Sequence, residues 1–145
     1  MVDVSGKPQA QRLATARGFI KLKPETVKAI REGGVAKGDP LQVAEVAAIL
    51  AAKKTPELAP LCHNIPLSKV DVSYRVVDGG VEATCTVKAV AVTGVEMEAL
   101  TGVVVALLNI WDMVKYLEKD EGGQYPYTRI TDVRVVEKVK SVEPP

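Results

Sequence analysis

The feature that most constrains the fold is a long segment that is apolar almost all the way round. From Ala99 to Trp111 the chain carries no charged residue, and the spacing of its aliphatic side chains predicts a helix over 95–119. The uncharged stretch is shorter than the run of about 20 apolar residues that crosses a bilayer, so we expect a core helix. A two-layer domain buries only one stripe of a helix. We therefore expect a second subunit to cover the other side, with Gly102 and Ala106 allowing close approach.

The other elements follow from hydrophobic periodicity and turn residues. Apolar and polar residues alternate over 70–76, and the turn Asp78-Gly79-Gly80 then predicts a hairpin with a strand over 81–92. Gly38-Asp39-Pro40 supplies an N-cap and a first-turn proline, which predicts a helix over 40–54. The remaining predicted elements are strands at 14–22 and 129–139 and a short helix from Pro24 to Gly33-Gly34.

The order of these elements is strand, helix, strand, strand, helix, strand, with one extra short helix. This order predicts an α+β fold, the ferredoxin-like β-α-β-β-α-β sandwich. The chain of 145 residues is long enough to bury a core of its own. We expect a single domain over residues 1–140 and a disordered tail over 141–145.

Composition and charge exclude several classes of function. A formal net charge of +1 gives no basic field for nucleic acid, and the predicted strands lack the aromatic residues with which RNA-binding modules stack bases. Met1-Val2-Asp3-Val4 does not begin a signal peptide, and two cysteines do not form a disulfide framework. We therefore expect a cytoplasmic protein that binds neither nucleic acid nor a membrane.

Three side chains on the long helix can take part in acid–base chemistry. Lys115 follows Asp112 by three positions, so the two can pair directly. Their apolar neighbours predict partial burial, which would shift both pKa values. The two residues are therefore either a catalytic acid–base pair or a surface ion pair near the helix end. Glu98 lies near the same helix face as Asp112, but about 21 Å away along the axis. If both act in one site, a neighbouring subunit supplies one of them.

Basic and sulfur-containing residues lie at helix ends and in one loop. Lys37 precedes a predicted helix N-terminus, where it is either an anion ligand or a solvated loop cation. Lys53-Lys54 ends the same helix, where the helix dipole alone favours cations. Cys62-His63 gives neither a catalytic dyad nor a metal site, because adjacent side chains point apart and no second histidine is present. His63 is either a phosphate ligand or a core histidine.

Several short motifs occur in the order of one known family. They are Met1-Val2-Asp3-Val4-Ser5, Lys37-Gly38-Asp39, Ala51-Ala52-Lys53-Lys54-Thr55, Leu61-Cys62-His63 with Pro66-Leu67-Ser68, Thr93-Gly94-Val95-Glu96-Met97-Glu98-Ala99-Leu100-Thr101 and Trp111-Asp112-Met113-Val114-Lys115. With these motifs the chain resembles the cyclic pyranopterin monophosphate synthases, the molybdenum cofactor biosynthesis protein C family, in its archaeal type. The resemblance runs from residue 1 to about 119.

The resemblance implies a lyase of ferredoxin-like fold that forms a homohexamer, a trimer of dimers, with active sites between subunits. The implied substrate is (8S)-3',8-cyclo-7,8-dihydroguanosine 5'-triphosphate, which is rearranged to cyclic pyranopterin monophosphate with loss of diphosphate. No cofactor and no protein-bound metal are expected, although Mg²⁺ on the triphosphate is compatible with the reaction. The implied catalytic residues are Asp112, Lys115 and Lys37. The implied substrate-binding residues are Arg12, Lys53 and His63 at the triphosphate, Met97 and Glu98 at the base, and Leu61, Cys62 and Glu96.

The chain departs from the family pattern at two places. Asn64 stands where many members have proline. The Lys-Ser-Gly-Gly-Lys segment of bacterial-type members is missing near the C-terminus, which leaves open whether Lys138 or Lys140 substitutes for its lysines. The alternative to an enzyme is a non-catalytic ferredoxin-like regulatory module that binds a small ligand at its subunit interface.

Overall fold

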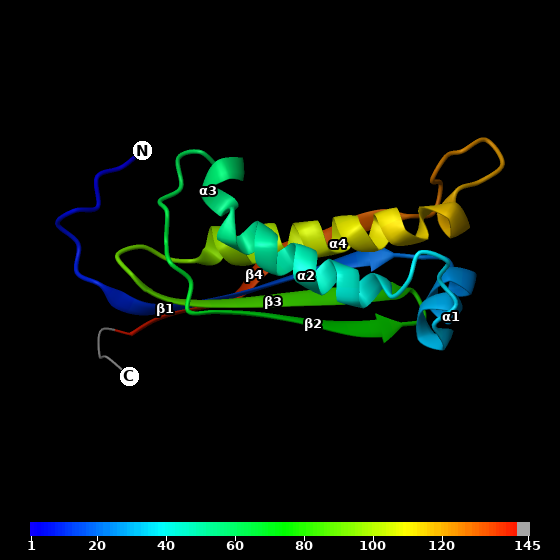
Figure 1. The fold of residues 1–145 in the computed structure, drawn as a ribbon, viewed down its shortest axis with the longest axis horizontal. Coiled ribbons are helices and arrows are strands. Elements are labelled where there is room, and N and C mark those ends of the chain that lie inside the picture. The colour runs from blue at the N-terminus through cyan, green and yellow to red at the C-terminus, as the bar shows by residue number, and fades with distance from the viewer. Residues whose placement is uncertain (142–145) are drawn as a thin grey trace.

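The computed structural model describes residues 1–141 as a two-layer α+β sandwich (Figure 1). The strands form one antiparallel sheet in the order β2-β3-β1-β4. This order and the alternation of strands and helices confirm the predicted ferredoxin-like fold. In chain order the elements are β1 (Ala10–Lys21), α1 (Pro24–Glu32), α2 (Pro40–Lys53), α3 (Thr55–Leu58), β2 (Lys69–Val77), β3 (Gly80–Ala91), α4 (Glu96–Glu118) and β4 (Arg129–Ser141).

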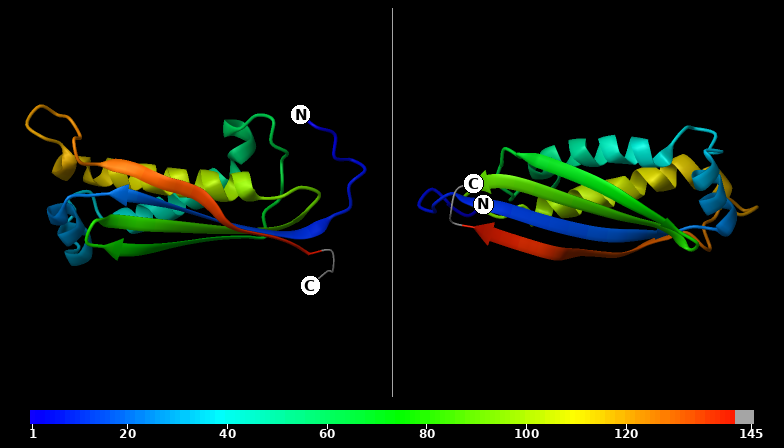
Figure 2. Two further views of the ribbon diagram at one scale, coloured as in Figure 1. Left: turned by 180° about the vertical axis from the view of Figure 1, so that it is seen from behind. Right: turned by 90° about the horizontal axis from the view of Figure 1, so that it is seen from below.

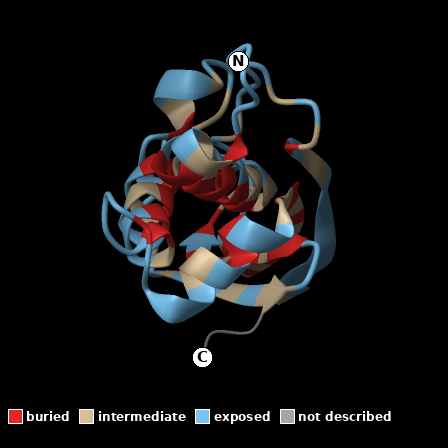
Figure 3. Ribbon diagram, turned by 90° about the vertical axis from the view of Figure 1, so that its right-hand side faces the viewer, coloured by how far each residue is buried: buried red, intermediate tan, exposed pale blue. Residues whose placement is uncertain are grey.

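The two long helices, α2 and α4, run side by side over one face of the sheet, and no element within residues 1–141 covers the other face (Figure 2). The core between the layers is built from small aliphatic residues, and Ala14, Ala16 and Ala83 have no exposed surface. Small side chains are needed because α4 lies very close to the sheet. At Gly18 a Cβ atom would come within 2.7 Å of the Leu107 side chain. Figure 3 shows the buried residues gathered between helices and sheet.

All of the predicted elements are present, with shifts at their ends. β1 begins at Ala10, four positions before the predicted start. The prediction began the strand too late because Arg12 interrupts the apolar pattern, although Arg12 lies in the strand and is buried. The single turn of α3 was not predicted. Ser141 is the last residue of β4, whereas the rest of the predicted disordered tail lies outside the described residues.

The long helix α4 is buried on one side and exposed on the other. Gly102 and Ala106 face the chain's own core, with Gly102 against Cys85 of β3, so the expectation that they face a partner subunit is wrong. In the middle of α4 the exposed apolar residues are instead Val104 and Leu108, which are 43% and 57% exposed. Among the described residues, α4 has the length and composition of a membrane-spanning helix, but half of its most apolar 18-residue stretch is buried inside the domain. The helix is therefore a core helix, as predicted.

Candidate active site

The residues predicted to act as acid and base lie together near the C-terminal end of α4. The Asp112 carboxylate is 3.0 Å from the Lys115 ammonium through Oδ1 and 3.7 Å from the Lys37 ammonium through Oδ2. Lys37 also donates a hydrogen bond of 3.1 Å to the backbone carbonyl of Asp112, which is 75 positions away in the sequence. One carboxylate is thus paired with two ammonium groups.

Pairing, rather than burial, shifts the pKa values of this cluster. The Asp112 and Lys115 side chains are 56% and 42% exposed, so the expectation of partial burial is confirmed for Lys115 and wrong for Asp112 in the single chain. The reason is that α4 turns Met113 and Val114 toward the core and Asp112 outward. The hydrogen bond and charge of Lys115, and then the charge of Lys37, lower the pKa of Asp112, and Asp112 in turn raises the pKa of Lys115. The carboxylate and ammonium therefore both stay ionised around neutral pH.

Lys37 reaches α4 from the short loop between α1 and α2. Gly33 is the C-cap of α1, and its φ of 70° is the left-handed conformation that glycine adopts without strain. Asp39 is the N-cap of α2, and its side chain accepts a hydrogen bond of 2.9 Å from the Leu41 N–H. Between these two ends the side chain of Val35 is buried and anchors the loop to the core. The sequence signals for the helix ends thus also place Lys37.

A second cluster of predicted residues surrounds a cavity of about 270 Å³ at the N-terminal end of α4. The wall comes from the loop after α3, from the turn after β3 and from the first turn of α4. Each of these segments carries part of the family-like motifs. The predicted substrate-binding residues in this wall are Leu61, Cys62, His63, Glu96, Met97 and Glu98.

The two carboxylates in this wall differ in their surroundings. Glu98 is only 3% exposed, and burial raises its pKa, with a further contribution from the charge of Glu96. Burial also acts on Glu96, but its pKa is lowered because the Lys138 ammonium lies 2.6 Å from Oε1 and Arg12 adds a second positive charge. The cavity therefore presents one ion-paired carboxylate and one buried carboxyl group that has no positively charged partner in the described part of the chain.

The remaining predicted binding residues lie near the same end of the fold. Arg12 donates to the carbonyls of Ala91 and Val92, at 3.3 and 3.2 Å, just before the turn into α4. His63 Nε2 is 2.6 Å from the carbonyl oxygen of Val2, so the imidazole is tied to the N-terminal segment. Lys53 is exposed at the end of α2, the end next to α3 (Figure 1).

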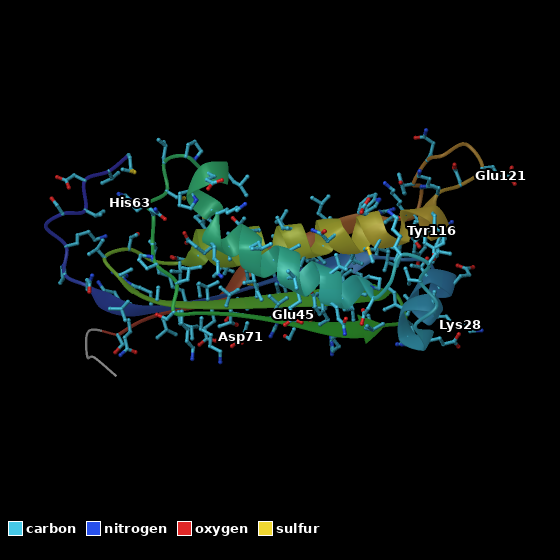
Figure 4. All side chains as sticks on the ribbon, viewed as in Figure 1. Lys28, Glu45, His63, Asp71, Tyr116 and Glu121 are labelled. Carbon is cyan, nitrogen blue, oxygen red and sulfur yellow. The ribbon has the colours of Figure 1, made fainter. Side chains whose placement is uncertain are left out.

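The two clusters lie at opposite ends of α4 and are not brought together within one chain. Glu98 and Asp112 are separated by about 21 Å along the helix axis. Figure 4 likewise places His63 and Tyr116, which lies four positions after Asp112, at opposite ends of the molecule. A small molecule cannot contact both clusters in one protomer. Within residues 1–141, no group of three or more His, Cys, Asp or Glu side chains is arranged to hold a metal ion.

Sequence reasoning missed two residues that contact these clusters. Tyr116 accepts a hydrogen bond of 2.7 Å from the Ala36 N–H, beside Lys37. Its spacing of four residues from Asp112 places it on the same helix face and could have indicated it. Lys138 was considered only as a substitute for a missing lysine, and its pairing with Glu96 joins β4 to α4. That pairing links positions in separate elements and leaves no local pattern in the sequence.

Comparison with known proteins identifies the family of this chain. The family model described as "MoaC family" matches residues 1–141. A protein of Pyrococcus abyssi named probable cyclic pyranopterin monophosphate synthase is 62% identical over 97% of this chain and 89% of its own length. Proteins of the same name from Thermococcus kodakarensis and Aeropyrum pernix are each 60% identical, over 99% and 97% of this chain and 92% and 96% of their own lengths. The chain belongs to the MoaC family.

Proposed function

We propose that the protein is a cyclic pyranopterin monophosphate synthase. In this reaction the cyclised dihydroguanosine triphosphate is rearranged to cyclic pyranopterin monophosphate and diphosphate. Family membership and the named relatives support a role in molybdenum cofactor biosynthesis as an enzyme of the lyase class. The observation that carries the proposal is the carboxylate of Asp112 paired with the ammonium groups of Lys115 and Lys37.

The proposed roles follow from the charge states of that cluster. The ionised Asp112 carboxylate accepts a proton and the Lys115 ammonium donates one, so the two can move protons as the purine-derived ring opens and the pterin ring closes. Lys37 stabilises negative charge beside them. An ion pair at 3.0 Å is suited to this work because both partners are in the required state at neutral pH.

The cavity at the other end of α4 would hold the substrate. A guanine-derived ring presents N–H groups that donate hydrogen bonds, and a carboxyl oxygen can accept them. Glu98, with Met97 beside it, would therefore hold the base. Positively charged or hydrogen-bonding side chains suit the triphosphate, and Arg12, Lys53 and His63 would bind it. Leu61, Cys62 and Glu96 complete the wall of the cavity.

We propose that the complete site forms between subunits of a homohexamer built as a trimer of dimers. The separation of about 21 Å between Glu98 and Asp112 supports this arrangement, because a cavity from one chain must meet the ion cluster of another. Val104 and Leu108 lie on α4 between the two clusters and are exposed in the protomer. A second chain docked along this face would bury them and would also desolvate the neighbouring Asp112.

The remaining parts of the proposal concern location and cofactors. A soluble biosynthetic enzyme family is consistent with a cytoplasmic protein, and a small-molecule substrate follows from the family. We propose that the reaction uses no cofactor held by the protein. Any Mg²⁺ would be carried by the triphosphate of the substrate rather than by a dedicated protein site.

The test is Asp112→Asn, assayed for product formation from the cyclised triphosphate. The variant keeps the side-chain shape but cannot accept the proton, so turnover should fall by a factor of about 100 to 10,000 with the fold unchanged. Asp71→Asn is the matched control, because Asp71 pairs with Lys69 at 3.2 Å on β2, outside both clusters. Unchanged turnover in Asp112→Asn would remove Asp112 from the mechanism. Ligand binding without any turnover by the unmodified protein would instead favour the regulatory module.

A further inference from the structure

The loop that carries Lys37 is attached to α4 at two points. One is the Lys37 ammonium, which donates to the Asp112 carbonyl at 3.1 Å. The other lies one residue earlier, where the Ala36 N–H donates to the Tyr116 hydroxyl at 2.7 Å. Both acceptors belong to α4 and lie four residues apart, which places them on one face of the helix. The loop and the helix therefore meet along a single turn of α4.

These two attachments do different work. The long lysine side chain has many rotamers, so its ammonium stays beside Asp112 only if its backbone is held at a fixed distance. The Tyr116 side chain has two rotatable bonds and a rigid ring, and it contacts the backbone directly. Gly38 follows Lys37 with φ of 119°, a conformation that side chains rarely adopt, and the Gly38 N–H donates to the Val35 carbonyl at 3.1 Å. The loop is thus a tight turn that Tyr116 fixes through the backbone of Ala36.

We propose that Tyr116 is a positioning residue for the reaction, which holds the Lys37 backbone through the Ala36 N–H so that the Lys37 ammonium remains at Asp112. The inference rests on the proposed function, since it assumes that Lys37 acts in turnover. Tyr116 itself touches no reacting atom in this role. The buried side chain of Val35 keeps the loop folded without the tyrosine hydroxyl. Loss of the hydroxyl therefore changes the position of Lys37 rather than the stability of the domain.

The test is Tyr116→Phe, which removes only the hydroxyl and keeps the ring. Loss of one neutral hydrogen bond predicts a fall in kcat of about three- to tenfold with little change in KM. Hydrogen exchange of the Ala36 amide, followed by NMR, should accelerate by a similar factor. Tyr127→Phe is the matched control, because the ring of Tyr127 lies under the Lys21 ammonium and not at the loop. The control should leave both kcat and Ala36 exchange unchanged.

A second pair of measurements separates positioning of Lys37 from a general structural effect. In a Lys37→Ala background, Tyr116→Phe should have no further effect on kcat, because the lysine that it positions is gone. An equal loss in both backgrounds would overturn the proposal, and so would unchanged Ala36 exchange in Tyr116→Phe. The exchange experiment needs no turnover. An unmodified protein that fails to form product would therefore refute the proposed function, while Ala36 exchange still decides whether Tyr116 holds the loop.

Discussion

Replacing Glu118, a buried carboxylate at the end of α4, with alanine should strongly destabilise the domain. Glu118 has no exposed surface and lies in the last turn of α4. Its carboxylate accepts hydrogen bonds from the backbone N–H of Lys23 at 3.1 and 3.3 Å, from the hydroxyl of Thr128 at 2.6 Å, and from the hydroxyl of Thr26. It thereby joins the start of α1 and the start of β4 to the end of α4.

The size of the effect follows from the three donors that lose their acceptor. A buried donor left without a partner costs about 1–3 kcal/mol. Three such donors give a loss at the upper end of what single substitutions cause, but two of them are hydroxyls that can rotate toward other acceptors. Removing a buried carboxylate that has no ion-pair partner among the residues described also recovers part of its desolvation cost. We therefore expect Glu118→Ala to lower the free energy of unfolding by about 3 kcal/mol.

Guanidinium unfolding followed by the fluorescence of Trp111, the single tryptophan, measures this change. The protein concentration must be held constant, because association of subunits adds to apparent stability. Glu121→Ala is the control, since Glu121 is exposed in the loop after α4 (Figure 4) and should change the free energy by less than about 0.5 kcal/mol. A loss below about 1 kcal/mol in Glu118→Ala would refute the assignment of Glu118 as the shared acceptor.

Two further predictions concern titration. Lys115→Ala should raise the pKa of Asp112 toward that of an ordinary aspartate, because the hydrogen bond from Lys115 is the largest cause of its lowering. Carbon-13 NMR of the Asp112 carboxyl group measures the midpoint of its titration. A midpoint that does not move would contradict the pairing. Glu98→Gln should be at least as stable as the unmodified protein at neutral pH but inactive, as unfolding and turnover assays will show. Burial raises the pKa of Glu98 in the folded protein above its value in the unfolded chain. The contribution of Glu98 to stability is therefore lost as the pH rises from the unfolded-state pKa to the folded-state pKa, and the glutamine variant should lack this loss.

Local patterns in the sequence predicted most of the fold. The hairpin turn at Asp78-Gly79-Gly80 and the cap at Asp39 depend on residues adjacent in the chain, so their chemistry can be read directly. A single helical turn such as α3 has too few residues to show a period. The early start of β1 was missed because Arg12 is satisfied by carbonyls of Ala91 and Val92, about which the local sequence says nothing.

The candidate site was predictable only in part for the same reason. The pairing of Asp112 with Lys115 follows from their spacing of three residues on a helix. The contact of Lys37 with Asp112 depends on how α1 and α2 pack over α4, and no short pattern encodes it. Partial burial of Asp112 was inferred from its neighbours, but helical geometry directs neighbours to different sides. The hydrophobicity of sequence neighbours therefore predicts burial poorly on a helix that packs against the core along one side only.

The single helix α4 acts as a spacer of fixed length between two chemically different clusters. Its backbone hydrogen bonds hold the span between Glu98 and Asp112 constant, so no loop movement can shorten it. Inserting one residue between them would rotate one end relative to the other by about 100° and shift it by about 1.5 Å, which would misalign both ends at once. The length of this segment should therefore resist insertion and deletion during divergence, even where the identities of its side chains are free to change.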